Sequence, residues 1–159
     1  MTSNAQRAAV LTRALEARIA GDRAAMAETF TDDVRAWTPA LSVTSLPELL
    51  VEFDRHDDAF SDAVLEIVPL DVGGEFACAE WSVSMTHSGP LELAAGSVVE
   101  PTGVRVTVHG VTVAEFRGDR ICALRQHWDE LAVFEQLGLV HSGDDLGGHE
   151  LAQARSDDS

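Results

Sequence analysis

The chain has 159 residues, with 27 acidic and 11 basic side chains and a formal net charge of −16. Such an acidic surface repels nucleic-acid phosphates and anionic lipids, so neither is an expected partner, and no apolar run is long enough to cross a membrane. All of the basic residues are Arg, and the lack of Lys excludes Schiff-base chemistry.

Two helices and a short strand are predicted at the start of the chain. A capping box that begins at Ser3 predicts a helix over residues 4–20, and Asp22 is a suitable N-cap for a second, shorter helix. A turn is predicted over residues 31–33, followed by a strand over residues 34–38 that ends at a proline.

A third helix is predicted to begin after Ser45, which starts another capping box. Leu49, Phe53, His56 and Phe60 are spaced by three or four residues and therefore share one face of this helix. His56 then lies between two phenylalanines. It is either a histidine at the edge of the core, satisfied by one hydrogen bond, or a polar group over a pocket.

The second half of the chain is predicted to consist of strands that pair as antiparallel hairpins. The apolar pattern changes phase near Gly110, which predicts a bulge there. Helices come early and strands late, and this order indicates an α+β fold in which a curved antiparallel sheet wraps around the N-terminal helices and leaves an apolar cavity. The strands are expected over residues 63–72, 75–87, 104–117 and 121–128.

The strand over residues 75–87 has two different faces. One face carries Trp81, Val83 and Met85 and ends at His87, which predicts the wall of a core or pocket. The opposite face is small and mildly polar. Side chains of this kind favour packing against a second copy of the chain, so we expect a homodimer.

The last predicted strand has one residue that does not fit its face. Gln126 is an amide between Leu124 and Trp128 on an otherwise apolar face, which is where we expect a ligand. Asp129 is a suitable N-cap for a terminal helix with a stripe that includes Phe134. The stripe as a whole consists of Leu131, Phe134 and Leu137.

Composition and motif spacing indicate a cytoplasmic protein with one domain over residues 1–140 and a disordered acidic tail over residues 141–159. The N-terminal segment carries charges through its apolar positions, unlike a signal peptide or an anchor. Cys78 and Cys122 are expected to be reduced core residues. Neither a metal-ligand spacing nor a glycine-rich phosphate loop occurs, so we expect no metal and no cofactor.

The run from Val108 to Leu139, with its R-G-D-R turn and its H-W-D and E-Q-L-G-L segments, resembles the SnoaL-like polyketide cyclases of the nuclear transport factor 2-like superfamily. Residues 86–89 and 101–103 are similar to the family's T-H-x-G and P-T-G motifs. The resemblance implies a cone-shaped α+β barrel over roughly residues 5–140. It leaves the reaction open, because this fold hosts cyclases, isomerases, dehydratases, epoxide hydrolases and non-enzymes.

The resemblance also implies where acid–base groups should stand, and the chain departs from it there. Active members often carry an Asp five residues after the isoleucine that begins the last strand, and the position counted from Ile121 is Gln126. The strand histidine of the cyclases falls on Thr112 in an ungapped count. An amide cannot abstract a proton and can only position or polarise a ligand.

The sequence is therefore compatible with two functions. The first is a cofactor-independent acid–base enzyme that cyclises or isomerises an apolar, polyketide-like small molecule, or opens an epoxide, with His87 as general acid–base and Gln126 holding a substrate oxygen. The second is a non-catalytic small-molecule-binding or accessory module. The residues expected to shape the cavity are Trp37, Phe53, His56, Trp81, Met85, Thr112, Trp128 and Phe134.

Overall fold

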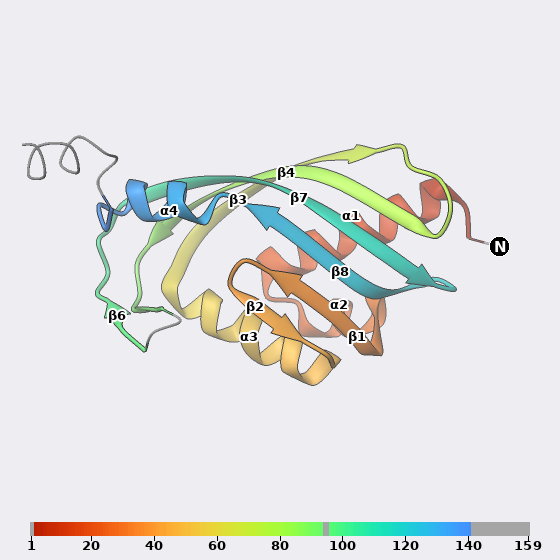
Figure 1. Ribbon diagram of the computed structural model, residues 1–159, viewed down its shortest axis with the longest axis horizontal. Coiled ribbons are helices and arrows are strands. Elements are labelled where there is room, and N and C mark those ends of the chain that lie inside the picture. The colour runs from red at the N-terminus through yellow and green to blue at the C-terminus, as the bar shows by residue number, and fades with distance from the viewer. Residues whose placement is uncertain (1, 94–95, 141–159) are drawn as a thin grey trace, which may run out of the picture.

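The computed structural model describes residues 2–93 and 96–140, and the predicted tail lies outside this range. Long curved strands arch over the N-terminal helices (Figure 1). The helices are α1 (Asn4–Ala20), α2 (Arg23–Thr29), α3 (Leu46–Ala59) and α4 (Glu130–Gln136). The strands of the large sheet are β1 (Phe30–Thr38), β2 (Leu41–Val43), β3 (Phe60–Leu70), β4 (Phe76–His87), β7 (Arg105–Arg117) and β8 (Arg120–Trp128). A small hairpin pairs β5 (Leu91–Glu92) with β6 (Val98–Val99).

The large sheet has the strand order β2-β1-β8-β7-β4-β3. Its neighbours are antiparallel except for β1 and β8, which pair in parallel and join the N-terminal part of the chain to its last strand. The two outer strands, β2 and β3, do not pair with each other, so the sheet is curved but open. This arrangement confirms the predicted α+β class. None of the described helices is long and apolar enough to cross a membrane.

The helix ends lie close to where capping chemistry predicts them. The Ser3 side chain accepts a hydrogen bond from the backbone of Gln6, whose own side chain accepts one from the backbone of Ser3, and α1 ends at Gly21 with φ 67°. Asp22 and Ser45 cap α2 and α3, and each side chain accepts a hydrogen bond from the backbone N–H three residues further on, although the predicted capping box at Ser45 does not close, because Glu48 accepts from Thr44 instead. Local sequence therefore marks these ends.

Three predicted details are wrong. The predicted turn over residues 31–33 belongs to β1, because pairing with β8 already begins at Phe30 and resumes at Arg35. The pairing of β7 with β4 runs without a register shift past Gly110, and the register shift lies instead in the β7–β8 pairing between Glu115 and Phe116. In α4 Leu131 is 53 % exposed, while Val133 is buried with Leu137.

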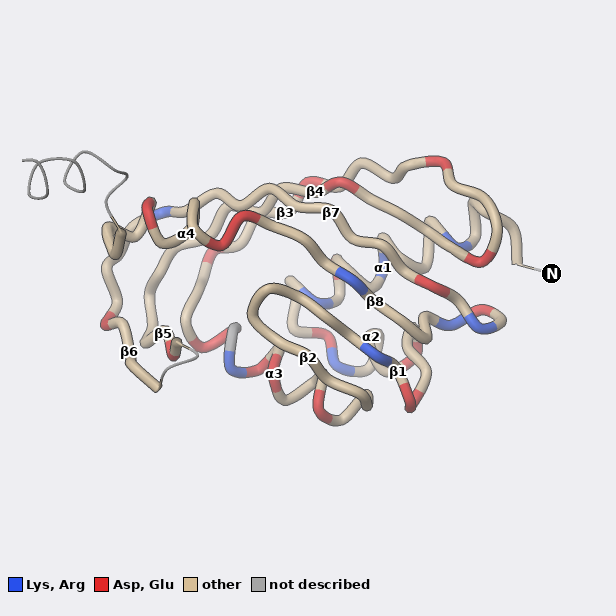
Figure 2. Tube along the Cα trace, viewed as in Figure 1, with Lys and Arg blue, Asp and Glu red and all other residues tan. Residues whose placement is uncertain are grey.

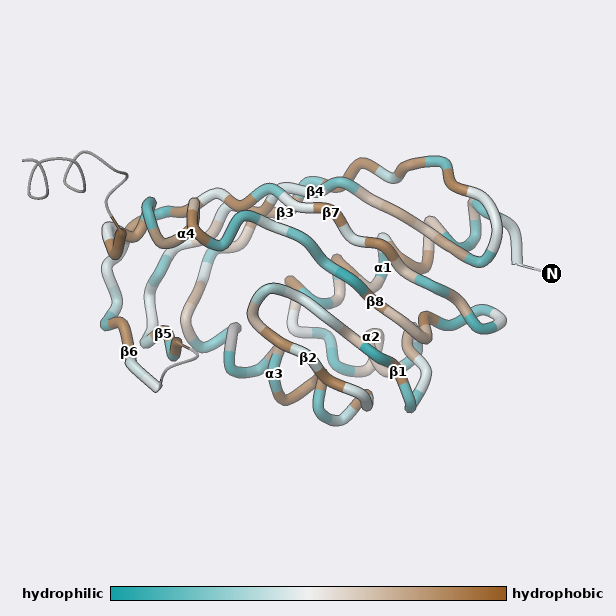
Figure 3. The backbone as a smooth tube through the Cα atoms, in the orientation of Figure 1, coloured by the Kyte–Doolittle hydropathy of each residue, from teal (hydrophilic) through white to brown (hydrophobic). Residues whose placement is uncertain are grey.

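The core consists of two apolar clusters on the concave face of the sheet. The first packs α1 and α3 against the sheet, and the second packs α4 against β4 and β7. Trp81 is half-buried and contacts both clusters. The long strands alternate between apolar and polar residues (Figure 3), which is the pattern expected when one face is buried.

Ion pairs connect the three N-terminal helices. Arg18 of α1 and Arg23 of α2 both bond to Asp57 of α3, and Arg23 also bonds to Asp54. Figure 2 shows acidic and basic residues together on these helices. The guanidinium of Arg18 lies 4.4 Å from the ring centroid of Phe53, and burial lowers its pKa, although Asp57 opposes this shift. These contacts join α3 to α1 and α2.

Candidate functional site

Three polar side chains meet on the concave face, one from each of three neighbouring strands. Trp81 Nε1 of β4 donates to Thr112 Oγ1 of β7 at 2.9 Å, and Gln126 Nε2 of β8 donates to the same oxygen at 2.9 Å. Thr112 lies directly opposite Gln126 in the β7–β8 register. Thr112 is fully buried, while Trp81 and Gln126 are half-buried. We call these three residues the amide cluster.

The backbone of β7 makes room for the indole of the amide cluster. Gly110 lies opposite Trp81 in the β4–β7 register. A Cβ at Gly110 would lie 2.3 Å from Cζ2 of Trp81 and 2.7 Å from the carbonyl oxygen of His127, far inside contact distance. The glycine that suggested a bulge therefore serves a close approach of an aromatic ring. Trp128 then meets Trp81 edge-on, with ring centroids 6.3 Å apart.

The amide cluster can form hydrogen bonds but has no group that titrates near neutral pH. An indole N–H, a hydroxyl and a carboxamide can orient or polarise a ligand oxygen, and none of them can take up a proton. Near this cluster the exposed surface of Trp81, Trp128 and Gln126 offers two aromatic rings and one amide. This combination suits an apolar ligand with a single polar anchor.

His87 occupies a different part of the molecule, at the end of β4. Its Nδ1 accepts a hydrogen bond from the backbone N–H of Thr102 at 3.2 Å and lies 3.0 Å from the hydroxyl of the same residue. The ring proton is therefore on Nε2, which is buried and has no hydrogen-bond partner among the described residues. The ring also lies 5.5 Å from that of Phe60. These contacts tie the segment before β7 to the end of β4.

The structure does not bring His87 and Gln126 together. Gln126 lies opposite Thr112, which lies opposite Ala79 of β4, and His87 is eight residues further along that strand. At about 3.3 Å per residue this separation is roughly 26 Å of strand. The expectation that the two side chains face one cavity fails, because sharing an inward face does not place residues at the same level of a long strand.

The other expected cavity residues fall into three groups. Trp37 is 44 % exposed and lies against His127 on the outer face, with ring centroids 5.1 Å apart and ring planes tilted by 46°, so it does not share a face with the amide cluster. Phe53 and Met85 are buried in the core, and the side chain of His56 lies outside the described part of the structure. Of the remaining residues, Trp81 and Thr112 belong to the amide cluster and Trp128 faces inward next to it. Phe134 is half-buried on α4.

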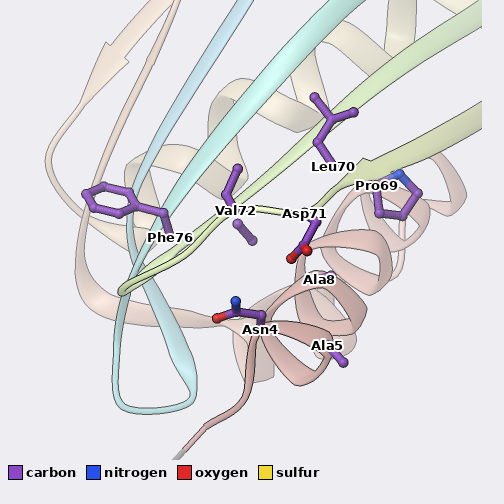
Figure 4. Close-up of a pocket in the computed structure, with 9 residues that line it drawn as sticks. Asn4, Ala5, Ala8, Pro69, Leu70, Asp71, Val72 and Phe76 are labelled. Carbon is purple, nitrogen blue, oxygen red and sulfur yellow. The ribbon is translucent and has the colours of Figure 1, made fainter.

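Sequence reasoning missed two shallow pockets along α1. One, of about 230 Å³, lies between the start of α1 and the β3–β4 turn (Figure 4), where Asn4 and Asp71 face each other across an apolar floor. The second, of about 480 Å³, lies between α1 and β3 and is lined by Ile19 and Leu65. Neither contains a member of the amide cluster. No sequence signal marks these pockets, because they depend on the spacing between α1 and the neighbouring strand β3 in the folded chain.

Both cysteines lie within strands of the large sheet. Cys78 and Cys122 are free and half-buried, and burial raises the pKa of the Cys78 thiol, with Glu80 adding to the shift. No group of three or more described His, Cys, Asp or Glu side chains is placed to hold a metal ion.

Comparison with known proteins identifies the family. A search of the curated proteins finds no match. Among solved structures, a protein from Jannaschia sp. CCS1, provisionally named a SnoaL-like polyketide cyclase, superposes with a TM-score of 0.75 at 19% identity, covering 87% of this chain and 95% of its own. IdmH from Streptomyces antibioticus, provisionally named a polyketide cyclase, gives 0.70 at 19% identity over 84% and 99% of the two chains. An epoxide hydrolase of M. tuberculosis, described as LEH-like, gives a TM-score of 0.65 at 14% identity over 84% and 90% of the two chains.

These structural likenesses concern the fold. The family model named SnoaL-like domain matches residues 11–124, well over half of the sequence, so the chain belongs to the SnoaL-like domain family.

Proposed function

We propose that this protein binds an apolar small molecule carrying at least one oxygen, and that Gln126 is the polar anchor for that oxygen. The observation that supports this most is the amide cluster itself, in which the half-buried carboxamide of Gln126 bonds to the same Thr112 hydroxyl as Trp81, and the ring of Trp81 packs edge-on against that of Trp128. A polar side chain on an apolar face must be satisfied by protein, water or ligand. Gln126 makes one hydrogen bond within the cluster, which leaves the rest of the hydrogen-bonding capacity of its amide for a ligand.

A second candidate is a cofactor-independent cyclisation or isomerisation of the same kind of ligand. Membership of the SnoaL-like family, and the names of two of its structural neighbours, favour this reaction. Gln126 would then stabilise charge that develops on the substrate oxygen. The proton acceptor would have to come from outside the amide cluster, since none of its members ionises near neutral pH. Epoxide opening is related chemistry, suggested by the mycobacterial neighbour, and needs the same missing group.

The substitution Gln126→Leu tests the anchor. Leucine keeps the side chain's approximate size and removes both ends of the amide, so an oxygen-bearing ligand should bind about tenfold more weakly, which corresponds to one hydrogen bond of ~1.4 kcal/mol. The probe is 9-fluorenone, a planar tricyclic ketone, titrated while following tryptophan fluorescence. His127→Leu is the matched control, because it removes a polar group from the same strand on the outer face. Equal affinity in wild type and Gln126→Leu, with a lower melting temperature in the variant, would mean that the amide is purely structural.

We also propose that two copies of the chain pair through the outer face of the sheet. This face exposes apolar side chains at both sides, with Trp37 at 44 % on β1 and Val64 and Val68 at 58 % and 57 % on β3. Half-buried Val111 and Val113 of β7 lie between them. Exposed apolar side chains on several strands of one sheet face favour association over exposure to water.

A further inference from the structure

The hydroxyl of Thr112 has a hydrogen-bonding problem in the amide cluster. An indole N–H can only donate, so Thr112 Oγ1 must accept from Trp81. With Gln126 Nε2 also donating, the oxygen accepts twice, and its own proton has no hydrogen-bond acceptor among the described residues. Thr112 is fully buried, so water does not reach this proton from bulk solvent. A buried hydroxyl with an unused proton is unfavourable.

A half-turn of the Gln126 carboxamide removes the problem without moving any other atom. The oxygen and nitrogen ends of a carboxamide are nearly equal in size, so the turned amide occupies the same space. Oε1 then lies where Nε2 was, 2.9 Å from Thr112 Oγ1, and accepts the hydroxyl proton. Every donor between Trp81 and Gln126 has an acceptor in this arrangement.

We propose that Trp81, Thr112 and Gln126 form a one-way hydrogen-bond relay, in which the indole donates to the hydroxyl and the hydroxyl donates to the amide oxygen. The relay turns the NH₂ group of Gln126 away from Thr112 and toward the ligand. Hydrogen bonds in such a chain polarise one another, so the amide is a stronger donor than an isolated glutamine. Gly110 supports the relay by admitting the Trp81 ring.

The relay assigns a chemical class to the ligand and rests on the proposed function. An amide NH₂ group that is presented to the ligand selects an acceptor oxygen, such as that of a ketone, a quinone or an enolate, and discriminates against ligands that can only donate. Thr112 is a positioning residue here: it acts through Gln126 and determines which end of the amide a ligand meets. If the amide kept its NH₂ on Thr112, its oxygen would face the ligand and would prefer a hydroxyl.

Neutron diffraction from crystals of the ligand-free protein soaked in D₂O tests the relay directly. We expect two deuterons on the end of the Gln126 amide remote from Thr112, and one on Thr112 Oγ1 directed at Gln126. Two deuterons on the end that faces Thr112 would overturn the relay. This readout needs no ligand, so it stands even if the proposed binding function fails.

A matched set of ligands tests the consequence for selectivity. Three tricyclic compounds are titrated, namely 9-fluorenone, 9-hydroxyfluorene and fluorene, which present an acceptor, a hydroxyl and no oxygen. The relay predicts that the ketone binds at least tenfold more tightly than the hydrocarbon, that Thr112→Val removes most of this difference, and that Thr112→Ser restores it. Thr107→Val controls for the substitution itself, because Thr107 lies on the outer side of β7. A tenfold preference that survives in Thr112→Val would overturn the role of Thr112, whereas failure of all three compounds to bind the wild type would count against the proposed function alone.

Discussion

At the scale of single residues, the main determinant of the site is a glycine rather than a polar side chain. The ring of Trp81 occupies the space that a side chain at position 110 would need. From this place the indole N–H of Trp81 reaches the hydroxyl of Thr112, and the same hydroxyl bonds to Gln126. The sequence alone could identify Gln126, because an amide stood on an apolar face. It could not identify the role of Gly110, since glycine in a strand is equally typical of a bulge.

The substitution Gly110→Ala measures this dependence. A methyl group 2.3 Å from Cζ2 of Trp81 must displace the ring or the strand, so we expect a loss of about 1–3 kcal/mol in the free energy of unfolding. Urea denaturation followed by circular dichroism gives this value. Gly73→Ala is the matched control, because a Cβ there meets nothing within 4 Å and the residue has no left-handed backbone. Similar stability of the two variants would mean that Trp81 does not require the glycine.

At the scale of secondary-structure elements, α4 is held to the sheet by a side chain that bonds to the free backbone edge of β7, as a neighbouring strand would. Beyond Trp128 the edge of β7 has no partner from β8. Gln136 of α4 fills this place: its Oε1 accepts from the backbone N–H of Thr107 at 2.8 Å, and its Nε2 donates to the carbonyl of Thr107 at 3.0 Å. These contacts position α4 beside the second apolar cluster.

Removing this amide should loosen α4 without unfolding the sheet. In Gln136→Ala both backbone groups of Thr107 turn to water, and we expect a loss of about 1 kcal/mol in stability. Hydrogen exchange at the Thr107 amide should accelerate, while amides in the middle of β4 keep their protection. Glu135→Ala, one residue earlier on the same helix, is the control. Unchanged exchange at Thr107 would show that α4 is held by its apolar contacts alone.

At the scale of the whole molecule, the sequence predicted the fold better than it predicted the site. Capping residues and strand periodicity are local signals, and they identified the helix ends and the faces of β4 and β8. The levels at which residues on different strands meet depend on register, which no local signal reports. For this reason His87 and Gln126 were placed on correct faces and yet expected to meet, and the parallel pairing of β1 with β8 was not foreseen.

The proposed pairing of two chains is also a property of the whole molecule. A dimer through the outer face should give a solution mass near twice 17.1 kDa by light scattering at micromolar concentration. Val68→Glu replaces an exposed apolar side chain with a carboxylate opposite Glu80 and should shift the mass toward that of a single chain, because burying this charge in an interface is costly. A wild-type mass of one chain would contradict the pairing and leave the ligand site unaffected.

The most direct test of the ligand site is a ¹⁵N–¹H titration of the wild-type protein with 9-fluorenone. The three tryptophans provide an internal comparison, because Trp81 shares the Thr112 hydroxyl with Gln126 and contacts Trp128, while Trp37 lies on the outer face. We predict that the indole signals of Trp81 and Trp128 and the side-chain amide signal of Gln126 shift together with one dissociation constant, and that the Trp37 signal stays in place. A saturable shift confined to Trp37, or to residues along α1 and β3 such as Ile19, would place the ligand elsewhere and contradict the account.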